Sequence, residues 1–395
     1  MPVILLDKPY VSSFLKNTLG RYQFPVVTTP AATPFLEPQI PTIGEDEAIA
    51  RARAAAHPRL YTNSENAIGW IAQNLGFSDL PDKIDLFKNK LRFRQLLQEE
   101  YPHFYFRGIS DTGLDTLDIA SVPVPFIIKP AVGFFSMGVY QVSAPEDWPQ
   151  TLAAIHAEIE MVRHLYPPQV MDASQFIIEE MIPGDEYAID AWFDEEGQPH
   201  IVGIYKHLFS SEADTSDRVY VTSRHIIETN LPRFTDFLTT IGRLADVRNF
   251  PLHAELRLSP EGVLQPIEIN PMRFGGWCTT ADMTARSFGL NPYQSYLQNQ
   301  PPNWPELLES KGDEVYAMIV LDNSTGIPGD DIRQFEYDRA TLSFDRVLEV
   351  RPLDWRTWPV FGFLFVQTDS EDACELRHLL NSDLREFVVR RDATI

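Results

Sequence analysis

The chain reads HAELRLSPEGVLQPIEIN over residues 253–270, and this stretch carries the strongest indication of the fold. Apolar and polar residues alternate on both sides of a Ser-Pro-Glu-Gly turn, which is the pattern of a β-hairpin. We expect Leu258 to pair with Val263, which places His253 opposite Glu268. Because opposed residues share one face of a sheet, one face is predicted to be polar. Its residues are His253, Glu255, Arg257, Glu268 and Asn270.

The other face of this hairpin is apolar and is expected to enter the core. Its residues are Ala254, Leu256, Leu258, Ile267 and Ile269. On the polar face two carboxylates and an amide converge, and the carboxylates repel each other unless a cation lies between them. Ligands that are all oxygen favour Mg²⁺ over zinc. The sequence therefore predicts a magnesium site on Glu255, Glu268 and Asn270, with a solvated sheet face as the alternative.

A second segment reads IIKPAVGFFSMGV over residues 127–139. A predicted strand delivers Lys129 into a turn with two glycines, and Ser136 and Gly138 lie in that turn. Glycines let backbone N–H groups approach a polyanion, and a lysine supplies a point charge to phosphate oxygens. The segment predicts a phosphate-binding turn. An ordinary hairpin with a surface lysine is the alternative.

A third segment reads FIIEEMIPGDE over residues 176–186. Apolar residues lead into Glu179 and Glu180, and a Pro-Gly turn follows. An adenine ring needs a backbone N–H and C=O inside an apolar slot, and a ribose diol suits a carboxylate. The segment therefore predicts a nucleoside site. A strand end with solvated acids is the alternative.

Composition excludes several classes of protein. The formal net charge of −23 argues against a nucleic-acid surface, which needs clustered Lys and Arg. Two cysteines, Cys278 and Cys374, provide neither a disulfide framework nor a CxxC site. No apolar run approaches the roughly 18–20 residues that span a bilayer. We expect an acidic enzyme of the cytoplasm, without a membrane or nucleic-acid partner.

The organisation of the chain predicts a mixed α/β (α+β) class. Strands and helices alternate over residues 1–100, which is typical of a small doubly wound domain. We expect amphipathic helices over residues 82–100 and 151–165. Residues 200–270 are expected to be rich in strands. The last part, from residue 304, is expected to be α+β, with strands at residues 315–321, 341–350 and 361–367.

Taken in order and spacing, the three segments resemble the ATP-grasp superfamily, which includes biotin carboxylase and D-alanine–D-alanine ligase. The resemblance covers residues 85–300 and implies an ATP-grasp fold. It implies an N-terminal preATP-grasp α/β domain (residues 1–100) and a small subdomain with the glycine loop (101–185). A large subdomain with the metal hairpin (186–303) and a C-terminal α+β domain (304–395) would follow.

The resemblance also implies roles for single residues. Glu255, Glu268 and Asn270 would hold two Mg²⁺ ions, with Mn²⁺ as an alternative. Glu179 would meet the adenine amino group and Glu186 the ribose. The implied ATP contacts are Lys90, Lys129, Ser136, Gly138, Glu179, Glu180, Met181, Ile182, Glu186 and Lys206. The implied catalytic residues are Arg273, Arg257 and Lys129.

The sequence departs from the family pattern in two places. Phe134 and Phe135 lie in the glycine loop, where small residues are more usual. Met272 intervenes between the Asn-Pro pair and Arg273, which is the arginine expected near the transferred phosphoryl group. Arg218 and Arg224, in or after a predicted covering loop, are the candidates to meet the second substrate.

The implied reaction is that of a carboxylate–amine ligase. A substrate carboxylate attacks the γ-phosphoryl group of ATP, and an amine then displaces phosphate from the acylphosphate. An amino acid or small peptide is the expected substrate class. The alternatives are a phosphotransferase or carboxylase on the same scaffold, or an ATP-binding scaffold without turnover. The sequence leaves the oligomeric state open, with a homodimer as one alternative.

Overall fold

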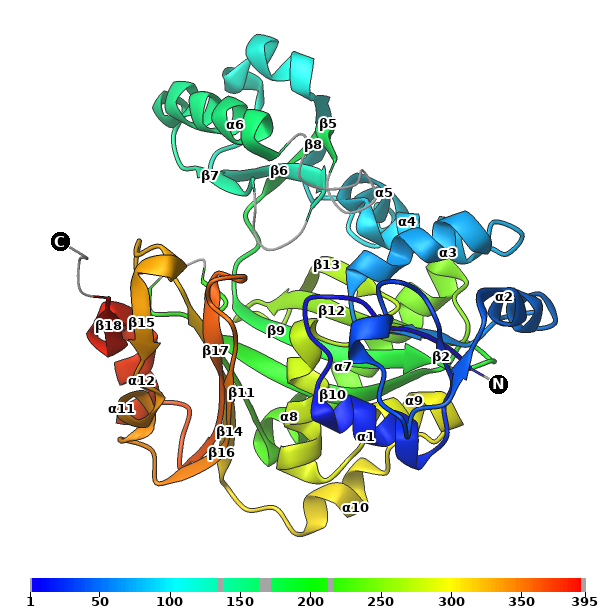
Figure 1. Cartoon of the computed structure of the whole chain (residues 1–395). Helices are drawn as coiled ribbons and strands as arrows, with labels where there is room; N and C mark the ends of the chain where they lie inside the picture. Colours follow the sequence, from blue (N-terminus) through cyan, green and yellow to red (C-terminus); the bar gives the residue numbers. More distant parts are fainter. Residues whose placement is uncertain (1, 134–137, 163–171, 212–215, 392–395) are drawn as a thin grey trace.

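The computed structural model describes residues 2–133, 138–162, 172–211 and 216–391 of the chain (Figure 1). Helices and strands are mixed along the chain, which confirms the predicted α/β (α+β) class. Within the described residues the strands form four sheets, of four, four, eight and two strands.

A small parallel sheet opens the chain, with the strand order β3-β2-β1-β4. The strands are β1 (Val3–Leu5), β2 (Val26–Val27), β3 (Thr42–Ile43) and β4 (Leu60–Thr62). Three helices belong to this part: α1 (Ser13–Arg21), α2 (Glu45–Arg53) and α3 (Ile68–Asn74). Ser12 caps α1, because its hydroxyl accepts a hydrogen bond from the Leu15 N–H. Parallel strands align their carboxyl ends, so the segments that follow β1 and β4 meet at one edge, where Asn63 donates to the Asp7 carbonyl.

The single helix predicted over residues 82–100 is wrong, because the structure divides it into α4 (Leu80–Lys88) and α5 (Lys90–Leu96). Asn89 separates them with an extended backbone (φ −85°, ψ 102°). Its side chain accepts hydrogen bonds from the N–H groups of Leu91 and Arg92 and so caps α5. The break gives Lys88 and Lys90 different surroundings, with consequences for the site described below.

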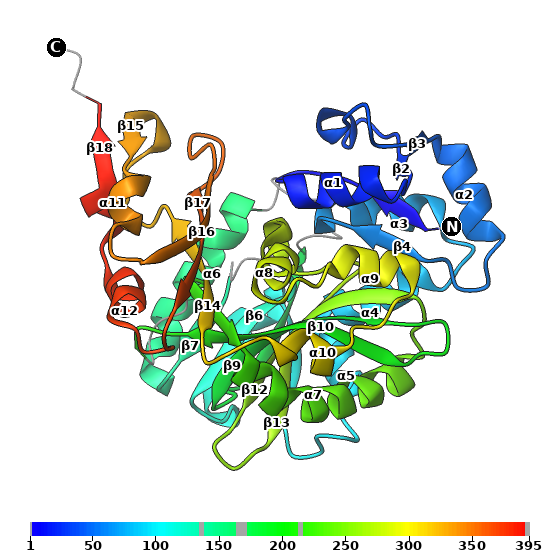
Figure 2. The ribbon, with the colours of Figure 1, turned by 90° about the horizontal axis from the view of Figure 1, so that it is seen from below.

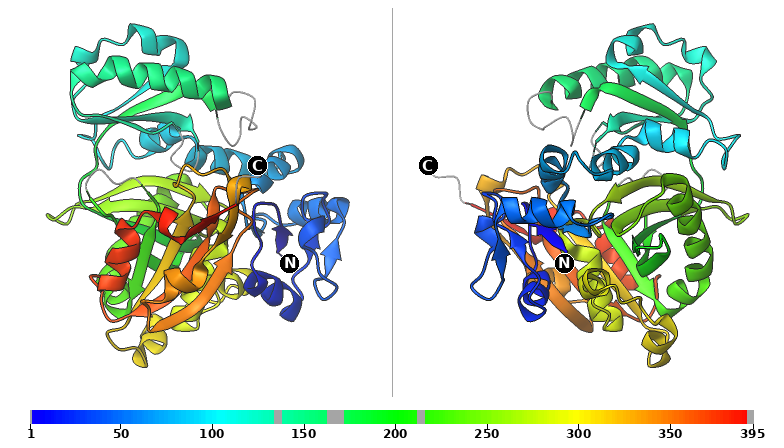
Figure 3. Two further views of the ribbon diagram at one scale, coloured as in Figure 1. Left: turned by 60° about the vertical axis from the view of Figure 1, so that its left-hand side comes forward. Right: turned by 90° about the vertical axis from the view of Figure 1, so that its right-hand side faces the viewer.

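A second four-stranded sheet has the order β5-β8-β6-β7 and is antiparallel at each pairing. Its strands are β5 (Phe106–Ser110), β6 (Phe126–Val132), β7 (Tyr140–Val142) and β8 (Asp172–Glu180). Helix α6 (Trp148–Val162) packs on one face through Trp148, Ile155 and Ile159. The helix predicted over residues 151–165 corresponds to α6, and residues 163–165 lie outside the described residues. The unit stands above the large sheet and is linked to it by the turn between β8 and β9 (Figure 3).

The largest sheet has eight antiparallel strands in the order β13-β12-β9-β10-β11-β14-β17-β16. The strands are β9 (Asp185–Phe193), β10 (Pro199–Leu208), β11 (Val219–Ser223), β12 (Phe250–Leu258), β13 (Leu264–Pro271), β14 (Val315–Asp322), β16 (Arg346–Pro352) and β17 (Val360–Thr368). β11 lies before the predicted domain boundary at residues 303 and 304, and β14 lies after it. Because these two strands pair over five residue pairs, the sheet is continuous across that boundary. The last three strands therefore extend the sheet that carries the hairpin of β12 and β13.

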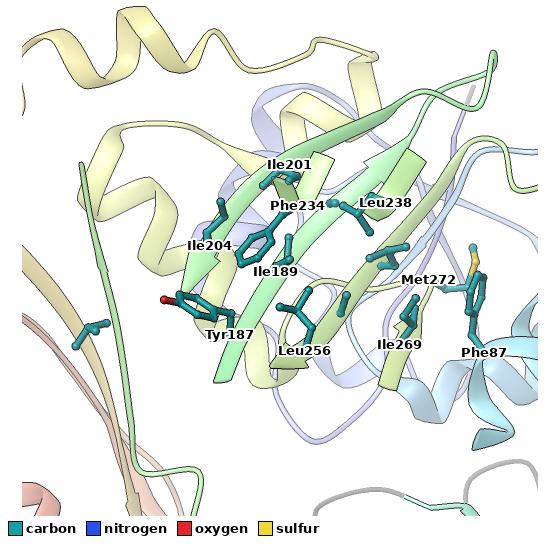
Figure 4. Packing of buried hydrophobic residues seen from close by; sticks show 14 of the residues in the cluster. Phe87, Tyr187, Ile189, Ile201, Ile204, Phe234, Leu238, Leu256, Ile269 and Met272 are labelled. Carbon is teal, nitrogen blue, oxygen red and sulfur yellow. The ribbon is translucent and has the colours of Figure 1, made fainter. Parts of the chain in front are cut away.

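The interpretation of residues 200–270 as rich in strands misses one long helix, α7 (Arg224–Ala245). Ser223 caps it by accepting a hydrogen bond from the Ile226 N–H. Phe234, Leu238 and Ile241 of α7 are fully buried and recur at helical spacing. They pack against the apolar face of the sheet, where Figure 4 shows Phe234 and Leu238 beside Ile189 and Leu256. This cluster is the main core, and the polar residues of the hairpin lie on the opposite face of the sheet.

Three helices follow the hairpin: α8 (Thr279–Phe288), α9 (Pro292–Gln298) and α10 (Trp304–Glu309). The N-terminal sheet and the C-terminal strands lie on either side of α8 (Figure 2). Asp282 of α8 contacts both sides, because it accepts a hydrogen bond from Ser12 and pairs with Arg351 at 2.6 Å.

The C-terminal part also contains a two-stranded sheet, β15 (Ile332–Phe335) with β18 (Val388–Arg390), and helices α11 (Tyr337–Thr341) and α12 (Cys374–Asn381). The strand predicted over residues 341–350 is wrong at its start, because residue 341 ends α11 and β16 begins at Arg346. None of the described helices is long and apolar enough to cross a membrane.

Candidate active site

The hairpin of β12 and β13 has a different register from the one predicted. Leu258 pairs with Leu264, and the turn is one residue longer. A bulge at Ile267 then shifts the register by one residue more, so that Glu255 lies directly opposite Glu268. Together the two shifts move the register by two residues. Because side chains alternate between the faces with a period of two, each residue returns to the face predicted for it. The predicted polar face is therefore correct, although Ile267 is a partly exposed bulge residue rather than a core residue.

Arg94 of α5 accounts for the position of this bulge. Its guanidinium donates to the carbonyl oxygens of Pro266 at 2.6 Å and Ile267 at 3.5 Å. A bulge leaves backbone groups outside the ladder, and buried groups of this kind need a partner. Arg94 supplies that partner from a segment that is distant in sequence.

Glu268 is held by a lysine and an amide. Lys90 places its Nζ 2.7 Å from Glu268 Oε2, and Asn270 donates from Nδ2 to Glu268 Oε1 at 3.1 Å. Burial alone raises the pKa of the Glu268 carboxyl, but the charge and hydrogen bond of Lys90 outweigh burial and hold it far below its usual range. Glu268 is therefore a carboxylate at neutral pH. Lys90 also reaches the Gly133 carbonyl at 3.4 Å, which brings the start of α5 to the glycine turn.

Glu255 is in the opposite electrostatic situation. Burial and the neighbouring charge of Glu268 raise the pKa of the Glu255 carboxyl. His253 offsets part of this effect, with its Nε2 3.6 Å from Glu255 Oε1. The histidine in turn is oriented by Asp190, whose Oδ1 is 2.7 Å from His253 Nδ1. Repulsion between two opposed carboxyls is the condition that a bound cation relieves.

Glu179 lies between two cations. Lys129 Nζ is 2.5 Å from Glu179 Oε1, and Arg94 Nε is 2.8 Å from Glu179 Oε2. All three side chains are almost completely buried. Although burial opposes ionisation, Arg94 and Lys129 lower the pKa of the Glu179 carboxyl to about 2. The carboxylate fixes Lys129 where β6 enters the glycine turn.

Arg273 is held by another largely buried glutamate, Glu65, which follows β4. Arg273 donates from Nε at 3.2 Å and from a terminal nitrogen at 2.5 Å to Glu65 Oε1. Lys88 pairs with the second oxygen, Glu65 Oε2. Burial raises the pKa of the Glu65 carboxyl, but Lys88 and Arg273 together lower it to about 2.

Glu186 and Arg257 form a further ion pair, next to the Pro-Gly turn. Arg257 donates from Nε to Glu186 Oε2 at 3.0 Å and also to the Ile182 carbonyl at 2.9 Å. His207 Nδ1 lies 3.1 Å from Glu186 Oε1, and its ring stacks on Tyr220 with centroids 4.3 Å apart. Burial is outweighed by His207 and Arg257, which lower the pKa of the Glu186 carboxyl. The group anchors the segment that contains Glu180, Met181 and Ile182, where the Glu180 N–H donates to the Tyr105 carbonyl.

Lys206 is not brought together with these residues. It pairs across the ladder with Tyr187, which belongs to the main core, so Lys206 lies on the face opposite to Glu255. Its Nζ contacts Asp185 at 3.1 Å and Glu371 at 3.4 Å. His207, the next residue, faces the polar side instead.

The structure also gives Arg218 and Arg224 other partners. Arg218 pairs with Asp322 at 3.0 Å and donates to C-terminal carbonyl groups, including that of Ser382. Arg224 donates to Glu228 and to the Lys311 carbonyl. Arg218 thus binds to the C-terminal part, and Arg224 binds to Glu228 of its own helix and to Lys311, so we assign neither of them to a substrate.

The glycine turn is described only in part. Ser136, Phe134 and Phe135 lie outside the described residues. Gly138 has φ +71°, and a Cβ there would lie 2.8 Å from Pro130 Cδ. Only glycine fits this position without a shift of the neighbouring ring.

Sequence reasoning missed Glu65, Arg94 and Asp190. Arg94 follows Lys90 by one helical turn, so both project from one face of α5, and this spacing was a usable signal. Glu65 and Asp190 act on residues more than 60 positions away, as the pairs Glu65–Arg273 and Asp190–His253 show. No local pattern indicates such contacts.

The donor set fits the predicted ion. Among the described residues, no three His, Cys, Asp or Glu side chains are grouped so that they alone would hold a metal. The set on the hairpin is instead two carboxylates, Glu255 and Glu268, with the amide of Asn270. An all-oxygen set with few protein ligands suits Mg²⁺, which keeps several waters and binds substrate phosphates.

Comparisons with known proteins bear on the fold that carries this site. Residues 122–281 match the ATP-grasp domain family. A comparison with curated proteins gives no match. Among solved structures, the chain is similar to an L-amino acid ligase from Bacillus licheniformis, with a TM-score of 0.68, 17% identity and coverage of 99% of each chain.

Two other solved structures show the same fold with nucleotides bound. An N5-carboxyaminoimidazole synthase from Aspergillus clavatus, in complex with ADP and 5-aminoimidazole ribonucleotide, has a TM-score of 0.61, 13% identity and 98% coverage of both chains. A biotin carboxylase from Campylobacter jejuni, in a β-γ-ATP complex, has a TM-score of 0.58 and 13% identity, with 93% of this chain and 87% of that chain covered. At these identities the likeness establishes the fold.

Proposed function

We propose that the protein is an ATP-dependent carboxylate–amine ligase, on the premise that residues 122–281 match the ATP-grasp domain family. The observation that carries the proposal is the arrangement around Glu268. A hairpin with two opposed carboxylates lies beside Lys90, while Lys129 and Arg273 are each fixed by a separate buried glutamate. Cations held in place around an all-oxygen site suit a metal–nucleoside triphosphate.

The residues divide the work of binding. Glu255, Glu268 and Asn270 would hold Mg²⁺, which neutralises charge on the β- and γ-phosphates when it is bound. Lys90 and Lys129 supply fixed charges to phosphate oxygens beside the glycine turn. The backbone of Glu180, Met181 and Ile182 is assigned to the adenine edge.

The ribose is assigned to Glu186, which Arg257 and His207 orient. This assignment gives Arg257 an indirect part, since its guanidinium fixes both Glu186 and the Ile182 carbonyl. Glu179 likewise positions Lys129, since Glu179 Oε1 lies 2.5 Å from Lys129 Nζ. Lys206 is not assigned to phosphate, because it lies on the other face of the sheet and pairs with Asp185 and Glu371.

In the reaction that we propose, the substrate carboxylate oxygen attacks the γ-phosphorus in line, and ADP leaves. Arg273 balances charge on the transferred phosphoryl group. An amine then attacks the acyl carbon, and phosphate leaves as the C–N bond forms. The protein supplies positioning and charge, which are the main contributions to phosphoryl transfer.

Amino acids or small peptides are the proposed substrates. The support is the likeness, over 99% of both chains, to a protein whose described activity is L-amino acid ligation. A carboxylase remains the second candidate, because biotin carboxylase and the aminoimidazole synthase share the fold.

We further propose that the chain is divided into four parts: residues 1–100, 101–185, 186–303 and 304–395.

The test is a pairwise screen of the amino acids for phosphate release with Mg-ATP. We expect release that requires two amino acids and yields ADP and a dipeptide, identified by mass spectrometry. The Lys129→Gln variant is the matched control for contaminating ATPase. Release that needs bicarbonate and only one amine substrate would favour the carboxylase, and no release with any pair would remove the support for the ligase.

A further inference from the structure

Glu65 lies outside the matched domain, yet its side chain enters the site. It follows β4 at the carboxyl edge of the N-terminal parallel sheet, in a short turn that Ser64 caps. Its two oxygens bind different cations: Oε1 accepts from Arg273 and Oε2 pairs with Lys88. All three side chains are about nine-tenths buried or more, so water screens these contacts only weakly.

The backbone beside Arg273 is tied to the same strand. Met272, the residue that departs from the family pattern, is fully buried and has φ +67°, which is unusual for a residue other than glycine. Its carbonyl accepts the Thr62 N–H at 2.8 Å, and its N–H donates to the Pro251 carbonyl at 2.8 Å. The left-handed turn at Met272 thus directs Arg273 toward β4 and Glu65.

The hydrogen bonds of the guanidinium leave part of it for a ligand. A guanidinium has five N–H bonds. Two of them donate to Glu65 Oε1, and a third donates to the Phe274 carbonyl at 2.9 Å. Within the described residues, the remaining two, one on each terminal nitrogen, have no hydrogen-bond partner. Arg273 is therefore held in one orientation with donors to spare.

Glu65 also competes with the metal ligands for Arg273. Arg273 follows the end of β13, the strand that carries Glu268, by two residues, and the charges of Glu255 and Glu268 act on it as well as that of Glu65. Without the Glu65 carboxylate, the guanidinium is free to turn toward those two acids and to occupy the place of a cation there. Lys88, which acts electrostatically on Glu268, is held back by the same carboxylate.

We propose that Glu65 is a positioning residue, which aims Arg273 at the transferred phosphoryl group and keeps Arg273 and Lys88 away from the Glu255–Glu268 pair. The proposal rests on the proposed function and deepens it, because it makes the N-terminal part necessary for phosphoryl transfer. It also explains Met272, whose backbone conformation brings Arg273 within reach of Glu65.

The test is a double-mutant cycle with Glu65→Gln and Arg273→Lys. Lysine keeps the positive charge of arginine but lacks the planar guanidinium that donates from two nitrogens at once. Glu65→Gln should lower kcat by about 10–100-fold, the usual effect of losing a residue that orients a functional group. It should also raise the Mg²⁺ concentration needed for half-maximal rate. In the Arg273→Lys background the same change should lower kcat by less than about 2-fold, because its effect passes through Arg273.

The matched control is Glu47→Gln, which breaks a surface pair with Arg51 in the same part of the chain. It should leave kcat and the Mg²⁺ requirement unchanged. Multiplicative effects of Glu65→Gln and Arg273→Lys on kcat would overturn the proposal, as would an unchanged Mg²⁺ requirement.

A second readout separates this proposal from the ligase assignment. The same four proteins are unfolded by heat without ligand, and Mg²⁺ binding to each is measured by the shift in Tm. We expect the losses of stability from the two single variants not to add, and the shift with Mg²⁺ to be smaller in Glu65→Gln. If no amino acid pair supports turnover, the ligase assignment fails, but additive losses and an unchanged Mg²⁺ shift would still be required to overturn the role of Glu65.

Discussion

Glu255 lies directly opposite Glu268 in the hairpin, yet the pKa values of the two carboxyls shift in opposite directions. The difference comes from Lys90, which pairs with Glu268 and not with Glu255. Burial and the charge of Glu268 make Glu255 the acid whose ionisation is costly. The two ligands assigned to one metal therefore contribute differently to the protein without metal.

The first prediction concerns this pair. Glu255→Gln keeps the volume of the side chain but removes the repelled charge, so it should raise the Tm of the metal-free protein slightly. Turnover with Mg-ATP should fall by orders of magnitude, since metal neutralisation of a transferring phosphate contributes several kcal/mol. Differential scanning calorimetry without Mg²⁺ and a phosphate-release assay check the two effects.

Glu268→Gln is the comparison for this prediction. It also removes a metal ligand, but it leaves the buried Lys90 ammonium without its carboxylate. Breaking a buried pair from one side costs about 3–5 kcal/mol. Both variants should be inactive, and they should differ in the sign of the change in Tm. The same sign for both would contradict the electrostatic asymmetry.

The second prediction separates folding from chemistry. Leu256 is fully buried on the opposite face of β12, next in sequence to Glu255. Leu256→Ala should cost about 2–5 kcal/mol of the free energy of unfolding through a core cavity. The KM for ATP should stay within about 2-fold, because binding residues are untouched. Urea unfolding and steady-state kinetics measure the two, and a large increase in KM would place Leu256 in the site.

The third prediction concerns the nucleotide. We expect Mg-ATP to raise the Tm, since a ligand that binds only the native state stabilises it. GTP should raise it much less, because the backbone of Glu180 and Ile182 is assigned to the adenine edge. Fluorescence-monitored melting with each nucleotide at equal concentration provides the measurement, and equal shifts would contradict the assignment of residues 180–182.

The fourth prediction is a loss of stability in acid. The Glu179 carboxyl has a pKa of about 2 in the folded protein, whereas a glutamate without these interactions has a pKa of 4.5. A depressed pKa contributes stability that is complete above the unfolded value and disappears as pH falls from about 4.5 toward 2, by about 3 kcal/mol in total. Glu65 has the same window and adds to the effect.

Glu179→Gln tests this window. At pH 7 the variant should be less stable than the natural chain, because Arg94 and Lys129 lose their shared carboxylate. The difference in the free energy of unfolding should shrink as pH falls from 5 to 2. A difference that is constant over that range would show that Glu179 is not ionised against these cations.

The sequence was sufficient for the fold class and for the face of the hairpin that carries the acids. Alternation in β12 and β13 places Glu255 and Glu268 on one face in both the predicted and the observed register, because the two shifts of one residue add to two and a shift of two residues keeps the face. The bulge itself depends on Arg94, which belongs to another element, and so no property of residues 253–270 indicates it.

Local competition explains the errors in secondary structure. Asn89 interrupts a continuous helical pattern because its side chain caps the following helix, and the apolar spacing on both sides gives no sign of the break. Helix α7 was hidden by the β-branched residues at its start and by Pro232 inside it, although Phe234, Leu238 and Ile241 have helical spacing. The role of Glu65 depends on the meeting of β4 with the segment after β13, which only the tertiary structure shows.

The unbroken pairing of β11 with β14 has a consequence for any shortened form of the chain. If the chain ended at residue 303, β11 would change from an inner strand to an exposed margin, with the unpaired N–H and C=O groups of Val219 to Ser223 open to other molecules. Arg218 would lose the Asp322 carboxylate and the Ser382 carbonyl that now hold it at the start of that strand. Such a fragment should self-associate through this margin, and the last third of the sheet thus protects the rest of it from aggregation.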